Sequence, residues 1–358
     1  MPHRAKLISQ QRIAADLGFS QSLVSKVLNG SHAGIPDATV RAVWRHAREQ
    51  GYRPRGIDLD LFVADAVATR MVGYILRSPL RLTSESHIFQ HAHEGLHRHL
   101  ARNNVRTVFI GTESDIDPME LAAVMRRQKL MLGLVLMGEV QREFMQSVAG
   151  CGKPMVVISG RHPGLAHSML SDFAQSGELL VEHLHRLGHR RFAWIGSGHS
   201  AGSLARHRDA LVQALDRRGL VLEPRYEAVG PEADRHHGHE AAADLLDRNR
   251  RRPPTALICF NAMMARAAMN LIFQRGLHVP RDLSVAAFDM TGVCTEERPH
   301  ITSAAAAPEM FGLRAAELIL AQGHPPEGGG LREIVLPSEL VRRDTSGPAP
   351  HPTPRRRS

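Results

Sequence analysis

The chain has 358 residues, 43% of them hydrophobic, which is enough for two or three domains with sizeable cores. Its three cysteines, Cys151, Cys259 and Cys294, are widely spaced, so the sequence favours a reduced cytoplasm over a disulfide framework or a zinc finger. No long apolar run follows the basic residues at the start, and no 18 consecutive residues are apolar and uncharged. We therefore expect neither secretion nor a membrane-spanning helix.

The net charge of +9 is concentrated near the two ends of the chain. Residues 1–55 contain nine Lys and Arg but only three Asp and Glu, which gives this segment a net charge of +6. Arg355, Arg356 and Arg357 contribute the remaining +3, so residues 56–354 are neutral overall. A basic segment attached to a neutral body is typical of a protein with one nucleic-acid-binding module.

The segment from Ser20 to Asn29 has the spacing of a helix with one apolar and one polar face. Val24, Val27 and Leu28 recur at helical intervals, which places them on one side of the helix. The opposite side carries no carboxylate and can therefore approach phosphate groups without repulsion. Its residues are Gln21, Ser22, Ser25, Lys26 and Asn29.

The flanking residues complete the pattern of a helix-turn-helix module. Ser9 can cap a preceding helix, Gly18 can end it in the left-handed conformation, and Ser20 can cap the next helix. A third helix is predicted from about Asp37, with one apolar side made of Val40, Val43, Trp44 and Ala47. Three short helices around one apolar centre are the minimum for such a DNA-binding head.

The polar side chains of the second helix predict a division of roles on DNA. Gln21 and Ser22 would face base edges in the major groove, where a glutamine can pair with adenine. Lys26 can reach a guanine or a phosphate. Contacts that position the head on phosphate oxygens, without adding sequence choice, are expected from Ser20, Ser25 and Asn29.

Beyond a linker at 56–70, short apolar runs alternate with amphipathic segments of helical length. Two series of buried strands are predicted, at 71–76, 105–110, 132–137 and 155–158, and at 192–195, 226–229, 256–260 and 283–288. The helices predicted between them include 88–102, 174–187, 204–219 and 238–248. This alternation indicates an α/β fold with two lobes of parallel sheet flanked by helices. Ligands of such sheets bind at the carboxyl ends of the strands, here expected in the cleft between the lobes.

Motifs along nearly the whole chain, from about residue 8 to residue 344, resemble those of the LacI/GalR-type transcriptional regulators. They are Ile13–Ser20, Val24–Gly30, Thr39–Arg41 and Gly51–Pro54 in the head, and His183–Arg191, Pro254–Ala256, Val279–Val285 and Glu339–Thr345 in the body. The resemblance implies a helix-turn-helix head on a core like that of periplasmic binding proteins. It also implies a repressor that acts as a homodimer on a pseudo-palindromic operator in double-stranded DNA, with recognition helices roughly 34–36 Å apart. Pairing of dimers into tetramers stays open.

The resemblance also implies a hinge helix that inserts a leucine into the minor groove at the centre of the operator. Counting from Pro54, this leucine is Leu61. The insertion costs a few kcal/mol of base unstacking, which is offset by the contacts that the bent DNA permits. Asp58 and Asp60 depart from the family pattern because they would lie close to phosphates. The alternative is that apolar residues of the hinge, Leu59, Leu61 and Phe62, pack between two heads.

In this family a cleft with several polar groups holds a small effector, often a sugar or a nucleobase. Asn261 and Asp289 are retained here, whereas the pocket arginine falls on His207, unless neighbouring Arg208 substitutes for it. Ala262 replaces an aspartate, which removes charge-assisted hydrogen bonds to a sugar. Two hypotheses remain open. Either a different, anionic ligand is held by Arg161, His207, Asn261 and Asp289, or the protein has no effector and represses constitutively or follows another signal.

Three further motifs suggest other chemistry. Residues 93–97 match HExxH, which on a helix can bind zinc, but 22 histidines make an accidental match unsurprising. Residues 198–202 match the GxSxG of a nucleophile elbow, although Gly196 and Ser197 separate them from the preceding strand. Residues 234–240 (Asp-Arg-His-His-Gly-His-Glu) either bind a divalent metal or form a solvated loop that caps the following helix.

We therefore predict a DNA-binding head at 1–55, a hinge at 56–70, a two-lobed effector-binding and dimerisation core at 71–344, and a disordered Pro/Arg-rich tail at 345–358. The predicted function is sequence-specific regulation of transcription in the cytoplasm, without enzymatic activity, cofactor, metal or membrane attachment. The alternative is a cytosolic small-molecule-binding protein or a hydrolase that uses the GxSxG or the HExxH motif.

Overall fold

The computed structural model describes residues 9–28, 35–50, 69–77, 88–197, 203–321 and 330–350. The expectations for Asn29, for the hinge with Leu61, and for the GxSxG segment at 198–202 lie outside these residues. The chain divides into two compact units, one made of residues 1–81 and 104–154 and the other of residues 82–103 and 155–358.

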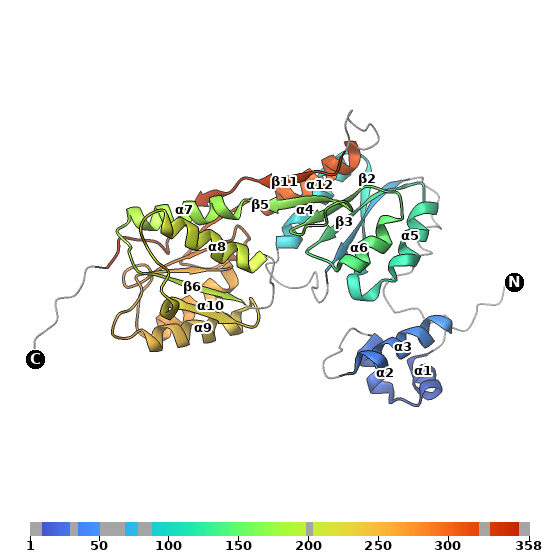
Figure 1. Cartoon of the computed structure of the whole chain (residues 1–358), viewed down its shortest axis with the longest axis horizontal. Helices are drawn as coiled ribbons and strands as arrows, with labels where there is room; N and C mark the ends of the chain where they lie inside the picture. Colours follow the sequence, from blue (N-terminus) through green and yellow to red (C-terminus); the bar gives the residue numbers. More distant parts are fainter. Residues whose placement is uncertain are drawn as a thin grey trace, which may run out of the picture. The chain divides into compact units, whose positions relative to one another are not determined.

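The strands form two six-stranded sheets, as the alternating pattern predicts (Figure 1). The first sheet has the order β11-β5-β4-β3-β1-β2, with bounds β1 Arg70–Leu76, β2 Val105–Thr112, β3 Met131–Met137, β4 Met155–Ile158, β5 His167–Ser171 and β11 Glu333–Leu336. The second has the order β12-β10-β9-β8-β6-β7, with bounds β6 Phe192–Ser197, β7 Glu227–Gly230, β8 Ala256–Cys259, β9 Ser284–Ala287, β10 Thr302–Ala305 and β12 Glu339–Val341. In the second sheet only β12 pairs antiparallel to its neighbour.

The helices lie between the strands in the sequence, which is the arrangement that parallel strands require. Their bounds in the body are α4 Ile88–Arg102, α5 Pro118–Arg127, α6 Arg142–Ala149, α7 Phe173–Arg186, α8 Ser203–Asp216, α9 Arg235–Arg248, α10 Ala262–Gln274, α11 Val293–Glu296 and α12 Pro308–Ala321. Figure 1 shows α7 and α8 on one side of the second sheet and α9 and α10 on the other. The second sheet is therefore covered on both faces, which explains why its central strands β6, β8 and β9 are buried along their whole length.

Glycines at helix contacts allow close packing of three helix pairs. A Cβ atom at Gly312 of α12 would lie 1.7 Å from the carbonyl oxygen of Ala92 in α4. A Cβ at Gly177 of α7 would lie 2.7 Å from the carbonyl oxygen of Ala210 in α8, and one at Gly238 of α9 would lie 2.7 Å from a Cα atom of α10. Backbones meet at these points, so a side chain there would force the helices apart.

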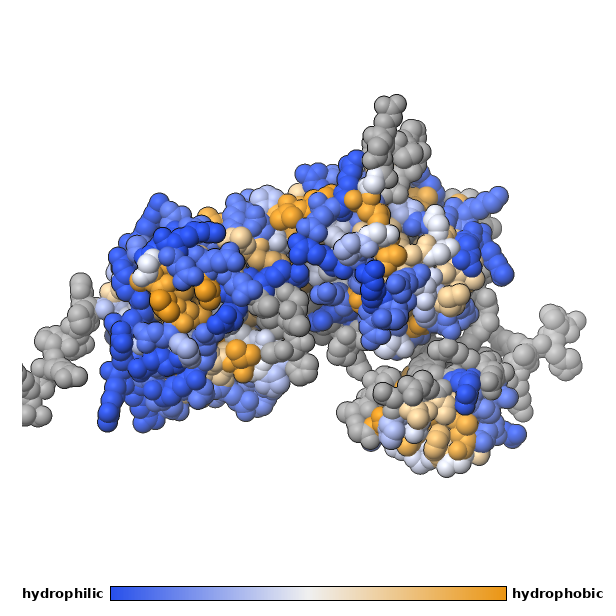
Figure 2. All heavy atoms as spheres, viewed as in Figure 1, coloured by the Kyte–Doolittle hydropathy of each residue, from blue (hydrophilic) through white to orange (hydrophobic). Residues whose placement is uncertain are grey.

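One face of the molecule, drawn in Figure 2, is mainly polar. Figure 2 shows hydrophilic residues over much of the face that it draws, with smaller hydrophobic areas between them. Large hydrophobic side chains exposed in the described part are Met119, Val221, Val229, Phe273, Leu277, Leu331 and Val335. None of the described helices has the length and apolar character needed to cross a bilayer.

The end of the chain differs from the expectation of disorder from residue 345. Thr345 is fully buried, and its hydroxyl donates to the carbonyl of Val285 in β9. Gly347 N–H donates to the Ser284 hydroxyl, and Ala349 N–H donates to the carbonyl of Leu187 after α7. Residues 345–350 therefore belong to the second unit, because backbone hydrogen bonds hold this Pro-rich segment to the sheet. Residues 351–358 lie outside the described part.

Candidate functional sites

The N-terminal head contains three helices, α1 Gln10–Leu17, α2 Gln21–Leu28 and α3 Asp37–Glu49. The Ser9 side chain accepts a hydrogen bond from Arg12 N–H at the start of α1, as predicted. Gly18 ends α1 with φ +66°, a left-handed conformation that glycine adopts without steric cost. The Ser20 hydroxyl then accepts from Leu23 N–H and caps α2. The caps and the glycine fix the turn between the two helices.

The two faces of α2 have the predicted environments. Val24, Val27 and Leu28 are buried in a small core shared with α1 and α3, whose other members are Ile13, Ala14, Val43 and Ala47. Three residues of the polar face, Gln21, Ser22 and Lys26, are exposed, and so is Ser20 just before the helix, whereas Ser25 is partly buried. The head therefore presents donor and acceptor groups on a helix whose opposite side is anchored.

An acidic residue of α1 is directed to α3. Asp16 contacts the Arg12 guanidinium at 3.1 Å and His46 Nε2 of α3 at 3.2 Å. These two groups engage the Asp16 carboxylate, and residues 20–28 of the α2 segment contain no acidic residue. This favours approach to a polyanion.

In the second unit, Asn261 and Asp289 lie where β8 and β9 end. The Asn261 side chain accepts from Met264 N–H and donates to the carbonyl of Ala233. Asp289 is buried and accepts from the backbone N–H groups of Ala262 and Thr291. Both side chains therefore hold the loops at the carboxyl edge of the second sheet in place.

His207 of α8 lies in an aromatic cluster that the sequence reasoning missed. The centroid of its ring is 4.2 Å from that of Phe173, 4.7 Å from Phe260 and 5.0 Å from Phe288. Phe260 and Phe288 directly follow β8 and β9, and Phe173 is the first residue of α7. The position of two phenylalanines as the last residues of predicted strands, at 256–260 and 283–288, was a usable signal, since the carboxyl ends of parallel strands meet at one edge. Phe173 comes from another element and carried no such signal.

The two arginines considered for this site are engaged elsewhere. Arg161 forms a bidentate ion pair with Glu333 of β11, with both N···O distances 2.9 Å. Arg161 in turn holds the pKa of Glu333 below its ordinary value. Arg208 pairs with both carboxylate oxygens of Glu227 at the start of β7, so it does not stand in for His207 as the pocket arginine. Of the four predicted residues, Asn261 and Asp289 lie beside α10 at one edge, whereas His207 contacts the phenylalanines and Arg161 contacts β11.

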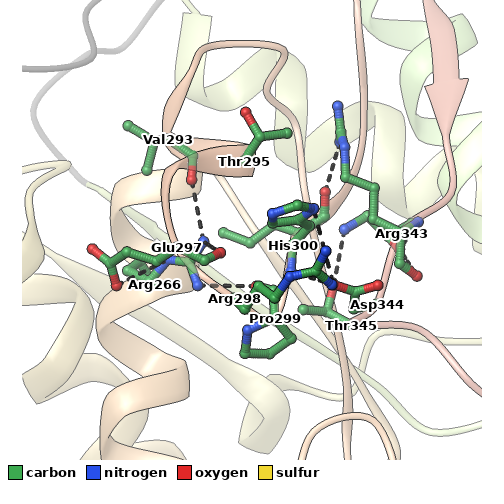
Figure 3. A network of polar contacts seen from close by, with 12 residues as sticks. Arg266, Val293, Thr295, Glu297, Arg298, Pro299, His300, Arg343, Asp344 and Thr345 are labelled. Carbon is green, nitrogen blue, oxygen red and sulfur yellow. Dashed lines mark hydrogen bonds and ion pairs between the residues drawn. The ribbon is translucent and has the colours of Figure 1, made fainter.

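A buried arginine of α10 holds the loop that follows Asp289. Arg266 is 2% exposed and donates to the carbonyl oxygens of Val293, Glu297 and Pro299 (Figure 3). Figure 3 also shows the neighbouring contacts of Asp344, which accepts from His300 N–H. Burial lowers the pKa of Arg266, which the Glu297 carboxylate at 3.8 Å opposes.

Comparison with known proteins identifies both parts of the molecule. A family model described as a periplasmic binding protein-like domain matches residues 181–346. The HTH-type transcriptional repressor PurR of Actinobacillus pleuropneumoniae serotype 3 (strain JL03) is 24% identical over 311 residues, and that of Glaesserella parasuis serovar 5 (strain SH0165) is 26% identical over 314 residues. Both alignments cover 86% of this chain, and they cover 89% and 88% of the two relatives. The alignments are too long to be confined to the body. The chain is similar over most of its length to LacI/GalR-type transcriptional regulators.

The fold agrees with this similarity. The lac repressor dimer bound to operator and an anti-inducer matches it with a TM-score of 0.65 at 20% identity, covering 96% of this chain and 100% of that one. The resemblance to the LacI/GalR-type regulators and the two-sheet fold predicted from the sequence are both confirmed. The roles assigned to single residues of the head and of the effector site remain predictions.

The HExxH motif of the regulator lies on α4 without the surroundings of a zinc site. The rings of His93 and His97 are stacked with centroids 6.0 Å apart, and Glu94 pairs with Arg98. Within the described ranges, no group of three metal-ligating side chains includes His93 or His97. Burial lowers the pKa of His93, and His97 acts in the same direction. The motif thus follows from the spacing of histidines on one helix face.

Proposed function

We propose that this regulator is a repressor that binds a pseudo-palindromic operator as a homodimer, with α2 in the major groove. The observation that carries the proposal is the exposed, carboxylate-free face of α2 above an anchored apolar core. A single head of this size contacts too few base pairs to select one site in a genome, whereas two heads about one duplex turn apart read a near-palindrome. The lac repressor, which shares the fold, is known as a dimer on its operator. Binding to DNA would place the protein in the cytoplasm with the nucleoid.

The experiment is a selection from a randomised duplex library at about 0.1–0.2 M salt, where sequence-independent binding is already weakened. We expect enrichment of a near-palindrome and a molecular mass of two chains on the selected duplex. A mass of four chains would extend the proposal to a tetramer. Binding that is equal for all sequences and disappears with salt would contradict it.

We infer that the effector site of this repressor accepts a flat or apolar ring in preference to a sugar. The side chains of Asn261 and Asp289 form hydrogen bonds with backbone groups of the protein, and Arg161 is paired with Glu333. The ion pair with Glu333 thus engages the positive charge that Arg161 would offer to an anionic ligand. What remains at the carboxyl edge of the second sheet is the cluster of His207, Phe173, Phe260 and Phe288, which offers ring faces and edges for stacking.

A thermal-shift comparison tests the effector inference. Adenine and benzamide serve as ring probes, benzoate as the anionic probe, and ribose and cellobiose as sugar probes. A ligand present at 100 times its Kd stabilises the folded state by about 2.7 kcal/mol, which is easily detected. We expect stabilisation by at least one uncharged ring probe, lost in Phe260→Ala. Stabilisation by a sugar or by benzoate alone would contradict the inference, and no response to any probe would favour a repressor without an effector.

We further propose that the protein acts without catalysis. Glu94, which would serve as general base in an HExxH peptidase, is paired with Arg98 on the exposed side of α4. The hydrolase alternative rests on residues 198–202, which lie outside the described part. Peptidase and esterase assays with added zinc test both alternatives, and turnover that Glu94→Gln or Ser200→Ala abolishes would overturn the proposal.

A further inference from the structure

The first two turns of α9 bring together two imidazoles and a carboxylate that the DNA-binding function does not use. One ring nitrogen of His236, one of His237 and a carboxylate oxygen of Glu240 all lie within 4.8 Å of one another. His236 and His237 have ring centroids 5.0 Å apart. We propose that these three side chains bind a divalent transition-metal ion of the zinc class. Imidazole and carboxylate groups are ligands that zinc, cobalt and nickel accept.

The closest pair already has the separation that a shared ion requires. His236 Nε2 lies 3.5 Å from Glu240 Oε1. Two ligand atoms bound to zinc at about 2.0–2.1 Å in tetrahedral geometry are roughly 3.3–3.4 Å apart. The two residues are one helical turn apart on α9, so the helix backbone sets this spacing. A small rotation of side chains that are 72% and 60% exposed brings them to the ion.

Asp234 gives His237 the support that metal-binding histidines usually have. Its Oδ1 atom lies 2.9 Å from His237 Nδ1 and also accepts from His237 N–H. A carboxylate on one ring nitrogen fixes the tautomer and orients the other nitrogen toward an ion. We therefore assign Nε2 of His237 as the ligand atom. The carboxylates of Asp234 and Glu240 also offset the partial positive charge of the helix N-terminus, which by itself disfavours a cation.

A second group of potential ligands in the described part, His91, Glu94 and Glu309, is less suited to an ion. His91 Nδ1 contacts Glu309 at 3.2 Å, and His91 Nε2 accepts from Gly292 N–H at 3.4 Å. Both ring nitrogens are thus engaged by the protein, and Glu94 is paired with Arg98. A metal ion bound there would compete with these three contacts. At the α9 cluster, a metal ion would disturb no contact between α9 and another element.

Binding at α9 would stabilise a loop next to the candidate effector site. The loop before Asp234 supplies the Ala233 carbonyl to which Asn261 donates. Arg235 lies 3.6 Å from Glu297, a residue of the network held by Arg266 (Figure 3). An ion that holds the start of α9 in place would therefore also hold the loop before Asp234, at the carboxyl edge of the second sheet. The metal site itself does not depend on the proposed repressor function.

The test uses the full-length protein after removal of metals by a chelator. Because the chain has 22 histidines, each measurement needs a matched control. Cobalt(II) is titrated and its visible ligand-field absorption recorded, and zinc is then added in competition. The variants are His236→Gln and Glu240→Gln, which replace exposed side chains. The control is His239→Gln, because His239 lies on the same helix but contacts Gln274 and is not part of the proposed site. Circular dichroism checks that all four proteins are folded.

We expect wild type and His239→Gln to bind one cobalt ion with an imidazole and carboxylate spectrum that zinc abolishes. His236→Gln and Glu240→Gln should bind the ion at least about tenfold more weakly, since even the loss of a group behind a ligand weakens metal binding 10–100-fold. Equal binding by all four proteins, or no binding by wild type, would overturn the proposal. Neither result depends on DNA binding, so failure of the metal site and failure of the repressor function are distinguishable.

Discussion

Gly312 of α12 lies directly against the carbonyl group of Ala92 in α4, and the space between them is too small for a methyl group. A Cβ atom at Gly312 would be 1.7 Å from the Ala92 oxygen and 2.5 Å from the nitrogen of Leu96. Both obstacles are backbone atoms, which do not rotate away as a side chain does. The two helices can therefore pack as observed only with glycine at this position.

Gly312→Ala should destabilise the protein by at least about 1–3 kcal/mol, the usual cost of overpacking a core. The matched control is Gly330→Ala, because no atom lies within 4 Å of a Cβ built there. Urea unfolding of both variants measures the difference in free energy of unfolding. Equal stability of the two variants would mean that α4 and α12 can separate at no cost.

Arg266→Met should destabilise the protein by about 3 kcal/mol or more. The variant removes a buried charge, which is favourable by itself, but it leaves the carbonyls of Val293, Glu297 and Pro299 without their donor (Figure 3). Each unsatisfied buried group costs about 1–3 kcal/mol. Arg298→Ala is the control, since its side chain is 79% exposed and pairs with Asp344 at 3.5 Å. Thermal unfolding of both variants measures the effect, and a Tm for Arg266→Met equal to that of the control would refute the role given to this arginine.

The stability of the protein should fall as the pH drops below about 6.5. Burial lowers the pKa of His189, with smaller contributions in the same direction from His183 and Arg190, while its hydrogen bond to Gly347 opposes the shift. Burial and Arg342 lower the pKa of His183. The unfolded chain, whose histidines titrate near 6.5, therefore binds more protons than the folded one at acid pH. The stability is complete above 6.5 and decreases below it, by up to about 1.4 kcal/mol per pH unit for each such histidine.

A pH series of urea unfolding checks this dependence. His189→Asn should flatten the decrease between pH 6.5 and pH 5, because one proton fewer is taken up on unfolding. An identical slope in His189→Asn and wild type would assign the acid sensitivity to other groups.

Gln21→Ala and Lys26→Ala should affect DNA binding in different ways. If Gln21 pairs with a base, its loss relaxes the preference at one operator position by about 1–3 kcal/mol. If Lys26 contacts phosphate alone, its loss weakens all sequences alike and reduces the slope of log K against log salt by about 1. Titration of the selected operator and of single-base variants at several salt concentrations measures both. Equal loss on every sequence with Gln21→Ala would exclude base reading by this residue.

The sequence predicted the helices, strands and helix caps that depend on residues close together in the chain. The helix at 88–102 and the strand at 155–158 have the predicted bounds, and the caps at Ser9 and Asp234 accept the backbone N–H groups expected of them. In each case neighbouring residues provide both partners. The strand at 167–171 was missed because His167 and Ser168 break its apolar run, although both are buried in the sheet.

The effector site was predicted less well because its contacts join distant parts of the chain. The sequence placed Asn261 and Asp289 at strand ends, but it did not indicate that their polar atoms bind the backbone. The pairing of Arg161 with Glu333 joins residues 172 positions apart. Sequence spacing does not predict contacts over such a separation. The ion pair that engages the charge of Arg161 was therefore recognised only from the structure.

The strand order of the two sheets has a consequence for the synthesis of the protein. β11 completes the edge of the first sheet and β12 the edge of the second, yet both come after every other strand in the chain. While the ribosome is still making α12, β5 and β10 therefore expose unpaired backbone groups at the sheet edges. Neither sheet has all of its strands until residues 333–341 are made. A premature stop between α12 and residue 333 would therefore leave β5 and β10 as unpaired edge strands, which invite aggregation.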